Sequence, residues 1–410
     1  MKKMVGMAAF VSSVLLLGVG HALALSPETT MLLELLKAKG VISQQEADEF
    51  TKTLEAKVPA ASEEDHHHSV QSLSDRVQRL EGKEGRWDEG IGKVRFSGLV
   101  EVDMGTARTK DAAGHKANSS DVTLATAQLN ADATINQYLN GHLVVLYEED
   151  PLASGDNGLG LDEAVIGLKG GETFSAYANA GRMYVPFGHF SSHFITDPLT
   201  LALGETNDTA VVAGFANETI DVNAGVFKGK VKETGQSDQI NSVVASATLS
   251  LPAASDEGLA LRGGLSYLSN LAATDGLEAE TVTSGEVADS VGGVSAFVSL
   301  AYGEKFFIDA EYLGALDHFA AGDFSFSDAD NRRPQAWNLE AAARIANGTE
   351  LALRYGGSEQ AGNFLAEDEY GAALLYELFP ETSVIIEYLF QEFQDESNNS
   401  QATMELAVEF

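Results

Sequence analysis

Apolar and polar residues alternate along most of the chain, and the clearest example is its last stretch, QATMELAVEF. One parity of this stretch holds the apolar residues Met404, Leu406, Val408 and Phe410. The other parity carries two acidic residues, Glu405 and Glu409. Alternation with a period of two predicts a β-strand with one apolar face and one polar face.

The same alternation recurs in sixteen segments from Lys93 to the end of the chain. They cover residues 93–106, 121–136, 141–150, 160–169, 175–186, 209–217, 219–228, 240–252, 258–270, 290–302, 304–317, 335–346, 349–358, 368–379, 382–394 and 401–410. Barrels of the bacterial outer membrane have an even number of strands, and a segment of about 9–11 residues crosses the bilayer at a tilt. Residues 91–410 are therefore predicted to form an all-β transmembrane barrel of about 16 antiparallel strands.

The connections between these segments alternate in length. Short links follow even-numbered segments, at residues 137–140, 347–349 and 380–382. Long polar links follow most odd-numbered segments, at residues 107–120, 187–208, 271–289 and 318–334. Outer-membrane barrels have short periplasmic turns and long external loops. The pattern predicts both termini in the periplasm and Phe410 in the inner aromatic girdle.

The residues before the barrel read as separate elements. Residues 1–24 combine Lys2 and Lys3 with a short apolar run and an Ala-Leu-Ala site, which predicts a secretory signal peptide. A membrane anchor is the alternative, but the run is shorter than the roughly 20 residues that a membrane helix needs. Capping patterns predict a pair of short helices over residues 25–58, followed by a linker over residues 59–68.

Residues 69–86 have the spacing of a short coiled coil. Four apolar residues are separated by three, four and three positions, as in two heptads: Val70, Leu73, Val77 and Leu80. Two heptads are marginal alone, so this segment is expected to act where another contact already holds subunits together. It predicts a homotrimer. The alternative is one amphipathic helix that lies on its own barrel.

Composition and charge restrict the compartment and the partners. The formal net charge is -35, so the chain would repel the phosphates of nucleic acid. The chain has no cysteine, which excludes disulfides, iron–sulfur clusters and haem attachment through CxxCH. Hydrophobic residues make up 44% of the chain, and this share suits a barrel because only alternate strand residues face lipid.

Parity also predicts which charged residues face the inside of the barrel. Threading strands 335–346 and 349–358 through their turn brings Arg344 near Glu350 and Glu340 near Arg354, as cross-strand ion pairs. The same parity places Arg262, Asp309 and Glu311 inside. Sixteen strands leave an aqueous channel, so these residues are expected to line a pore. The arginines are scattered among acidic residues, which argues against a phosphate-specific pore.

The connection after the fifth segment, residues 187–208, is the third external loop, and it is too apolar to lie in water. A loop folded into the lumen, where it narrows the pore, accounts for its position and its composition. His189, His193 and Asp197 are spaced by four residues, as metal ligands on a helical turn would be, but packing and hydrogen bonding in a constriction are the favoured interpretation. Asp197, Glu205 and Asp208 are expected in the narrowest section, where they would favour cations.

Several stretches resemble one protein family. LLELLKAKGVISQQEADEF, the coiled-coil segment, GRMYVPFGHFSSHFITDPLTLALGET and the terminal strand are similar to the LbtU-type siderophore porins. The helical start is shared more loosely with the phosphate-selective porins of the O/P type. The resemblance implies a sixteen-stranded outer-membrane channel that imports a small solute such as a ferric siderophore or another anionic chelate. It implies no cofactor and no particular binding residue.

Two other functions are compatible with the sequence. The helical segment could tether the outer membrane to the cell wall, with the barrel as its anchor. A barrel enzyme that acts on lipid or peptide is the third hypothesis, although the motifs GxSxG, HExxH and the P-loop are absent from the sequence. Sequence analysis therefore favours a porin without enzymatic activity, in contact with outer-membrane lipid.

Overall fold

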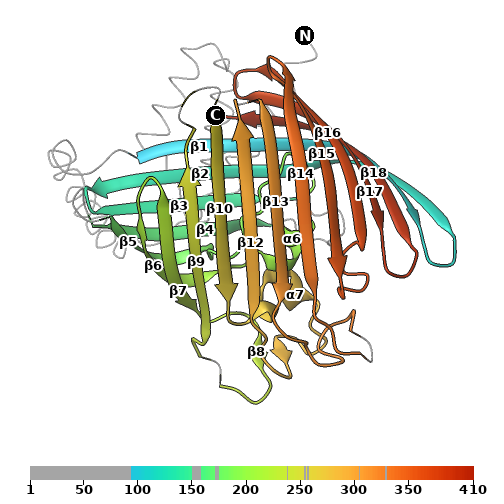
Figure 1. Ribbon diagram of the computed structural model, residues 1–410, viewed down its shortest axis with the longest axis horizontal. Coiled ribbons are helices and arrows are strands. Elements are labelled where there is room, and N and C mark those ends of the chain that lie inside the picture. The colour runs from blue at the N-terminus through green and yellow to red at the C-terminus, as the bar shows by residue number, and fades with distance from the viewer. Residues whose placement is uncertain are drawn as a thin grey trace, which may run out of the picture. The chain divides into compact units, whose positions relative to one another are not determined.

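The computed structural model describes residues 94–149, 158–170, 175–237, 239–253, 255, 258–303, 305–327 and 330–410. All of them belong to one compact unit, Arg86–Phe410. In this part of the chain, sixteen antiparallel strands close into a barrel (Figure 1). The predicted signal peptide, helical pair, linker and coiled coil, with Val70, Leu73, Val77 and Leu80, lie outside the described residues.

The barrel strands follow the predicted segments closely. They are β1 Val94–Lys110, β2 Lys116–Asn136, β3 Leu139–Tyr147, β4 Leu159–Lys169, β5 Ala176–Tyr184, β6 Asn207–Ala216, β7 Ile220–Phe227, β9 Ser242–Leu251, β10 Leu259–Leu268, β12 Gly293–Tyr302, β13 Phe306–Ala315, β14 Gln335–Ala346, β15 Thr349–Glu359, β16 Asp368–Phe379, β17 Thr382–Glu392 and β18 Asn398–Glu409. The predicted class, an antiparallel barrel of sixteen strands, is confirmed.

One predicted loop is wrong in its extent. Residues 107–120 were expected to form a long polar connection, but β1 continues to Lys110 and β2 begins at Lys116. The two strands stay paired up to Lys110 and Lys116, so only a tight turn remains between them. Both faces of the hairpin are exposed in this stretch, so neither face carries a row of apolar residues. Without that alternation, the sequence of a strand resembles the sequence of a loop.

The last strand closes the barrel against the first. Strand β18 pairs with β1 from Leu99 and Glu409 onward. At the end of this ladder, Gly98 and Phe410 exchange two backbone hydrogen bonds of 2.8 and 3.0 Å. A Cβ atom on Gly98 would lie 2.5 Å from the Phe410 ring. Only a glycine at this position leaves room for the ring to pack over the backbone. The terminal Phe therefore completes the closing strand.

The strands separate an apolar outer face from a polar inner face. On β14, the outward residue Leu339 is 46% exposed, whereas the next residue, Glu340, is fully buried. The outer face carries many exposed aromatic and aliphatic side chains, including Tyr302, Phe306, Leu353 and Ile386. This inversion of the usual arrangement suits a barrel surrounded by lipid. No described helix is long and apolar enough to span a membrane.

The two ends of the barrel differ. The turns that follow β2, β14 and β16 lie at one end, together with Val94 and Phe410, and the connections that follow β5, β7, β10 and β13 lie at the other. The longer connections contain α6 Leu199–Gly204, η1 Leu271–Ala273, α7 Asp275–Ala279 and a two-stranded sheet of β8 Lys232–Glu233 and β11 Glu286–Val287. In Figure 1, α7 and β8 lie at the end of the barrel opposite the C-terminus.

These connections share one apolar core at the long-connection end. Its loop residues include Phe187, Leu203, Leu271, Leu277, Phe319, Phe324 and Leu365. Helices α6 and α7 approach so closely that a Cβ atom on Gly276 would lie 2.0 Å from the carbonyl oxygen of Ala202. Among the described residues, none from β1, β2, β3 or β18 belongs to this core. The core therefore covers only one side of the barrel mouth.

Candidate functional site

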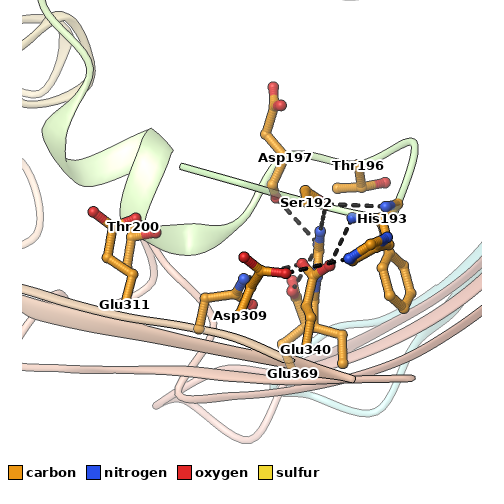
Figure 2. Close-up of polar contacts among 12 residues, drawn as sticks. Ser192, His193, Thr196, Asp197, Thr200, Asp309, Glu311, Glu340 and Glu369 are labelled. Carbon is orange, nitrogen blue, oxygen red and sulfur yellow. Dashed lines mark hydrogen bonds and ion pairs between the residues drawn. The ribbon is translucent and has the colours of Figure 1, made fainter. Parts of the chain in front are cut away.

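The connection between β5 and β6, residues 185–206, folds into the barrel and is bound to its inner wall. Glu311 of β13 accepts hydrogen bonds from the backbone amides of His189 and Phe190, at 2.8 and 2.9 Å. Its carboxylate also accepts from the Thr200 hydroxyl at 3.2 Å. A glutamate that is 8% exposed thus satisfies three donors of the loop, as Figure 2 illustrates for Thr200. The predicted inward loop is present.

A buried arginine holds the middle of the loop. The Arg354 guanidinium pairs with Glu340 at 2.9 Å and with Glu369 at 3.3 Å, and all three side chains are inaccessible to solvent. The same guanidinium donates to the Ser192 hydroxyl at 2.6 Å and to the Asp197 carbonyl at 3.4 Å. The predicted ion pair of Glu340 and Arg354 is therefore present, and its further role is to fix the loop.

An aromatic ring and a threonine complete this attachment. The Phe194 ring lies 4.3 Å from the Arg354 guanidinium carbon, as a cation–π contact. It fills space beside Gly371, where a Cβ atom would approach the ring to 2.5 Å. Thr196 donates to Glu387 of β17 from its amide, at 3.0 Å, and from its hydroxyl, at 2.6 Å. Strands β13 to β17 thus all contribute to loop binding.

The two loop histidines contact different parts of the wall. The His193 ring lies between Glu350, at 2.7 Å, and Asp309, at 3.2 Å. Burial lowers the pKa of His193, but its bonds to the two carboxylates raise it more, so the net shift is upward. The His189 ring stacks on Phe297 at 4.1 Å, and burial lowers the pKa of His189. Within the described ranges, no three His, Asp or Glu residues form a metal-binding group.

The other two predicted arginines, Arg344 and Arg262, also lie on the inner side of the barrel wall. Arg344 pairs with Glu350 at 3.6 Å, and its guanidinium carbon lies 5.1 Å from the centre of the Phe307 ring. Arg262 lies 5.9 Å from the ring of Phe297. A cavity of about 1290 Å³ opens at the short-turn end, lined by His193, Lys305, Phe307, Arg344, Glu350, Glu377 and Glu409 among others. The loop therefore forms the inner limit of a water-accessible vestibule.

Two acidic loop residues stay outside this hydrogen-bond network. Figure 2 shows the Asp197 carboxylate pointing away from the wall glutamates. Burial, and then the charges of neighbouring acids, raise the pKa of Glu205 to about 7. The neighbours include Asp197, and burial likewise raises the pKa of Asp197. Asp208 is separate: it lies on β6, where its carboxylate accepts from the amide of Gly229 at 3.1 Å.

A second group of acidic residues lies on β1 and β18, with which the loop forms no hydrogen bond among the described residues. Asp103 of β1 is directly opposite Glu405 of β18, and Glu101 is close enough to act on both electrostatically. In the described part of the chain, no lysine or arginine forms an ion pair with these three carboxylates. Glu101 and Asp103 were missed as candidates, although the alternation GLVEVDMG on β1 assigns both of them to the inner parity.

Known proteins resemble the chain at two levels. No family model matches the sequence. A UPF0422 protein of Coxiella burnetii is 27% identical over 304 residues, which are 72% of this chain and 63% of that protein. A UPF0422 protein of Legionella pneumophila is 23% identical over 240 residues, which are 54% of this chain and 44% of that protein. The chain thus matches less than two thirds of the length of these relatives.

Solved structures resemble the barrel itself. The outer membrane channel DcaP of Acinetobacter baumannii superposes with a TM-score of 0.55 at 13% identity, over 78% of this chain and 97% of that one. An anion-selective porin from Comamonas acidovorans also gives 0.55, at 12% identity, over 78% of this chain and 100% of that one. The chain has a porin-type fold. At this level of identity the likeness extends to the fold alone.

Proposed function

We propose that the protein is an outer-membrane porin, a passive water-filled channel that prefers small cations. One observation carries the proposal: the inward loop is bound to strands β13–β17, while Glu101, Asp103 and Glu405 on the adjoining strands β1 and β18 have no basic partner among the described residues. Acidic groups along a narrow passage with low-dielectric walls attract cations and repel anions. Solutes would pass between the loop and this acidic wall.

The outer surface supports a place in the outer membrane. Exposed apolar residues on the outward parity, such as Leu265 and Leu353, would face lipid, where polar backbone is tolerated only if the sheet is closed. The closed ladder between β1 and β18 meets this condition. The short turns and Phe410 are then periplasmic, and the long connections with their apolar core face the outside.

The acidic lining also bears on the solute. The resemblance to siderophore porins makes a ferric chelate one candidate, but unpaired carboxylates disfavour an anionic chelate in a narrow passage. Small cations and neutral or cationic chelates fit this lining better. We observe no arrangement among the described residues that favours an enzyme, and a cell-wall tether would depend on residues outside them.

We further propose that the channel is a homotrimer. The support is the heptad spacing of Val70, Leu73, Val77 and Leu80, which would pack on a threefold axis. Deleting residues 69–84 should weaken the trimer in detergent and leave the barrel folded. Sedimentation of the wild type and the deletion variant tests this, and a monomeric wild type would refute it.

Conductance of the purified protein in planar bilayers tests the channel. The wild type should give discrete steps of current. Shortening the loop from Phe190 to Leu203 should raise the single-channel conductance, because the segment that crosses the lumen is removed. It should also reduce the cation preference, since charges farther than about 10 Å from an ion are screened by salt at 0.1 M. A shortened barrel that folds and conducts like the wild type would show that the constriction lies elsewhere.

A further inference from the structure

The outer face of β1 changes from apolar to basic along the strand. Every second residue of β1 lies on this face, and from Val94 to Met104 none of these residues has a polar side chain. They are Val94, Phe96, Gly98, Val100, Val102 and Met104. At about 3.3 Å per residue and a tilt of about 40°, this row covers about 25 Å along the membrane normal, the height of the apolar band in such barrels. The lipid-facing band of β1 therefore ends near Met104.

Three basic residues, Arg108, Lys110 and Lys116, follow on the same face, and we call them the basic rim. Arg108 and Lys110 continue the outer parity of β1 beyond Met104, and Lys116 of β2 is the register partner of Lys110. Four residues of tilted strand place Arg108 about 10 Å beyond Met104 along the membrane normal. Headgroups occupy about 5–7 Å on each side of the hydrocarbon core. The long side chains of the basic rim can therefore reach into the headgroup layer.

The protein itself does not neutralise the basic rim. Lys110 and Lys116 are direct cross-strand partners, and like charges in this arrangement destabilise a sheet. In the described part of the chain, none of the three residues forms an ion pair. Asp111, the acid in the adjoining turn, instead binds the His115 ring at 2.9 Å. The residues of β18 that lie opposite Arg108 and Lys110 are uncharged.

We propose that the basic rim binds the phosphate groups of membrane lipid, in the leaflet at the long-connection end of the barrel. Continuity with the apolar band identifies the partner as a lipid, because the same face of β1 lies in hydrocarbon just below the rim. The charges are complementary: the formal net charge of the chain is -35, yet this face carries three uncompensated positive charges. Lysine and arginine near a membrane surface attract anionic headgroups, and the arginine fork binds phosphate in a bidentate manner. The inference rests on the proposed place in the outer membrane, not on conduction.

Lipid binding is measured by native mass spectrometry of the purified full-length protein in an uncharged detergent. One probe is lipid A with its two phosphates, and the other is the same lipid after both phosphates have been removed. A third series adds inorganic phosphate at the same concentration as the phosphorylated lipid. The apparent dissociation constant of each lipid is obtained from the bound fraction as the lipid concentration rises.

Two triple variants are compared with the wild type. The rim variant combines Arg108→Gln, Lys110→Gln and Lys116→Gln. The control variant removes the same charge near the short-turn end, by Arg95→Gln, Lys169→Gln and Lys305→Gln. Each basic residue near an anionic lipid surface strengthens binding about fivefold. The wild type and the control variant should therefore prefer the phosphorylated lipid by more than about tenfold, and the rim variant should lose this preference.

The outcomes separate the basic rim from the proposed channel. Equal binding of the two lipids by the wild type overturns the proposal, and so does an equal loss in the rim variant and the control variant. Displacement of the lipid by inorganic phosphate would indicate a site for the free anion and would also overturn it. A barrel that binds phosphorylated lipid through the rim but carries no current contradicts the proposed function alone. A conducting barrel without lipid preference contradicts the rim alone, and circular dichroism confirms that each variant has folded.

Discussion

Acidic residues occupy the inner parity of two neighbouring groups of strands, but their surroundings differ. On β13, β14 and β17, Glu311, Glu340 and Glu387 each accept a hydrogen bond from a backbone amide of the inward loop. On the adjoining strands β18 and β1, Glu101, Asp103 and Glu405 have no such donors and no basic partner among the described residues. The same residue type therefore binds a loop in one place and lacks such a loop contact in the other.

This difference has an energetic cause. A buried carboxylate is costly unless donors or opposite charges compensate for the lost water. The loop supplies amide donors, and Arg354 supplies the positive charge, so this half of the wall is satisfied by the protein itself. No loop amide and no basic residue from the described ranges compensates the acids on β1 and β18. Selectivity is expected to reside on these two strands.

The largest expected effect comes from Arg354→Leu. The change leaves Glu340 and Glu369 buried without a counter-charge and frees Ser192 from its strongest contact. Breaking a buried pair in this way costs about 3–5 kcal/mol. The loop should detach, and single-channel conductance should rise together with a loss of thermal stability. Both are measured on the same preparation, in planar bilayers and by thermal unfolding.

The matched control for this variant is Arg95→Leu. Arg95 also pairs with a carboxylate on the inner wall, Asp132, but its side chain is 79% exposed. Exposed ion pairs contribute only about 0–1 kcal/mol, so stability and conductance should stay near the wild type. Equal effects of the two variants would contradict a special role for the loop-binding half of the wall.

A smaller effect is expected from Gly371→Ala. The added Cβ atom would lie 2.5 Å from the Phe194 ring, so the ring must move away from the Arg354 guanidinium. Overpacking of this kind costs about 1–3 kcal/mol. Gly105→Ala on β1 is the control, because a Cβ atom there would have its nearest neighbour at 3.8 Å, an ordinary contact distance. Conductance noise should increase in the first variant alone, and identical traces would show that Phe194 does not fix the loop.

The smallest predicted effect concerns pH. Burial and the nearby charges of Asp197 and Asp275 raise the pKa of Glu205 from 4.5 to about 7. Raising the pH through this range charges Glu205, so the cation preference should increase, while His193 loses its proton in the same direction. Between the two pKa values the folded chain holds a proton that the unfolded chain has released, so this group favours folding less as pH rises. Glu205→Gln should remove its part of the selectivity change, and an unaltered pH profile would exclude Glu205 from the passage.

The barrel could be predicted from the sequence because its signals are local. Alternation gives each strand and its faces, so the partners of Arg344 and Arg354 followed from two strands and the turn between them. The strand limits differed most between β1 and β2, where both faces are exposed and the apolar parity disappears. Position and composition also indicated that residues 187–208 fold inward.

The contacts of the loop could not be predicted in the same way. Glu311, Glu340 and Glu387 bind amides that are 122, 147 and 191 residues away in sequence, and no periodicity connects such positions. Asp208 was grouped with Asp197 because the two are close in sequence, yet the whole of helix α6 lies between them and Asp208 is on β6. Strand parity alone would have assigned Glu101 and Asp103 to the inner face. That Asp103 lies opposite Glu405 follows only from the closure of β1 against β18.

The reversal potential of the wild-type protein under a KCl gradient tests the central claim most directly. It reports the ratio of K⁺ to Cl⁻ permeability through the open channel. Glu101, Asp103 and Glu405 predict a reversal potential of the sign that a K⁺-selective channel gives. In the variant Glu101→Gln, this potential should shift toward zero. A potential on the Cl⁻ side of zero would contradict a passage along the acidic wall.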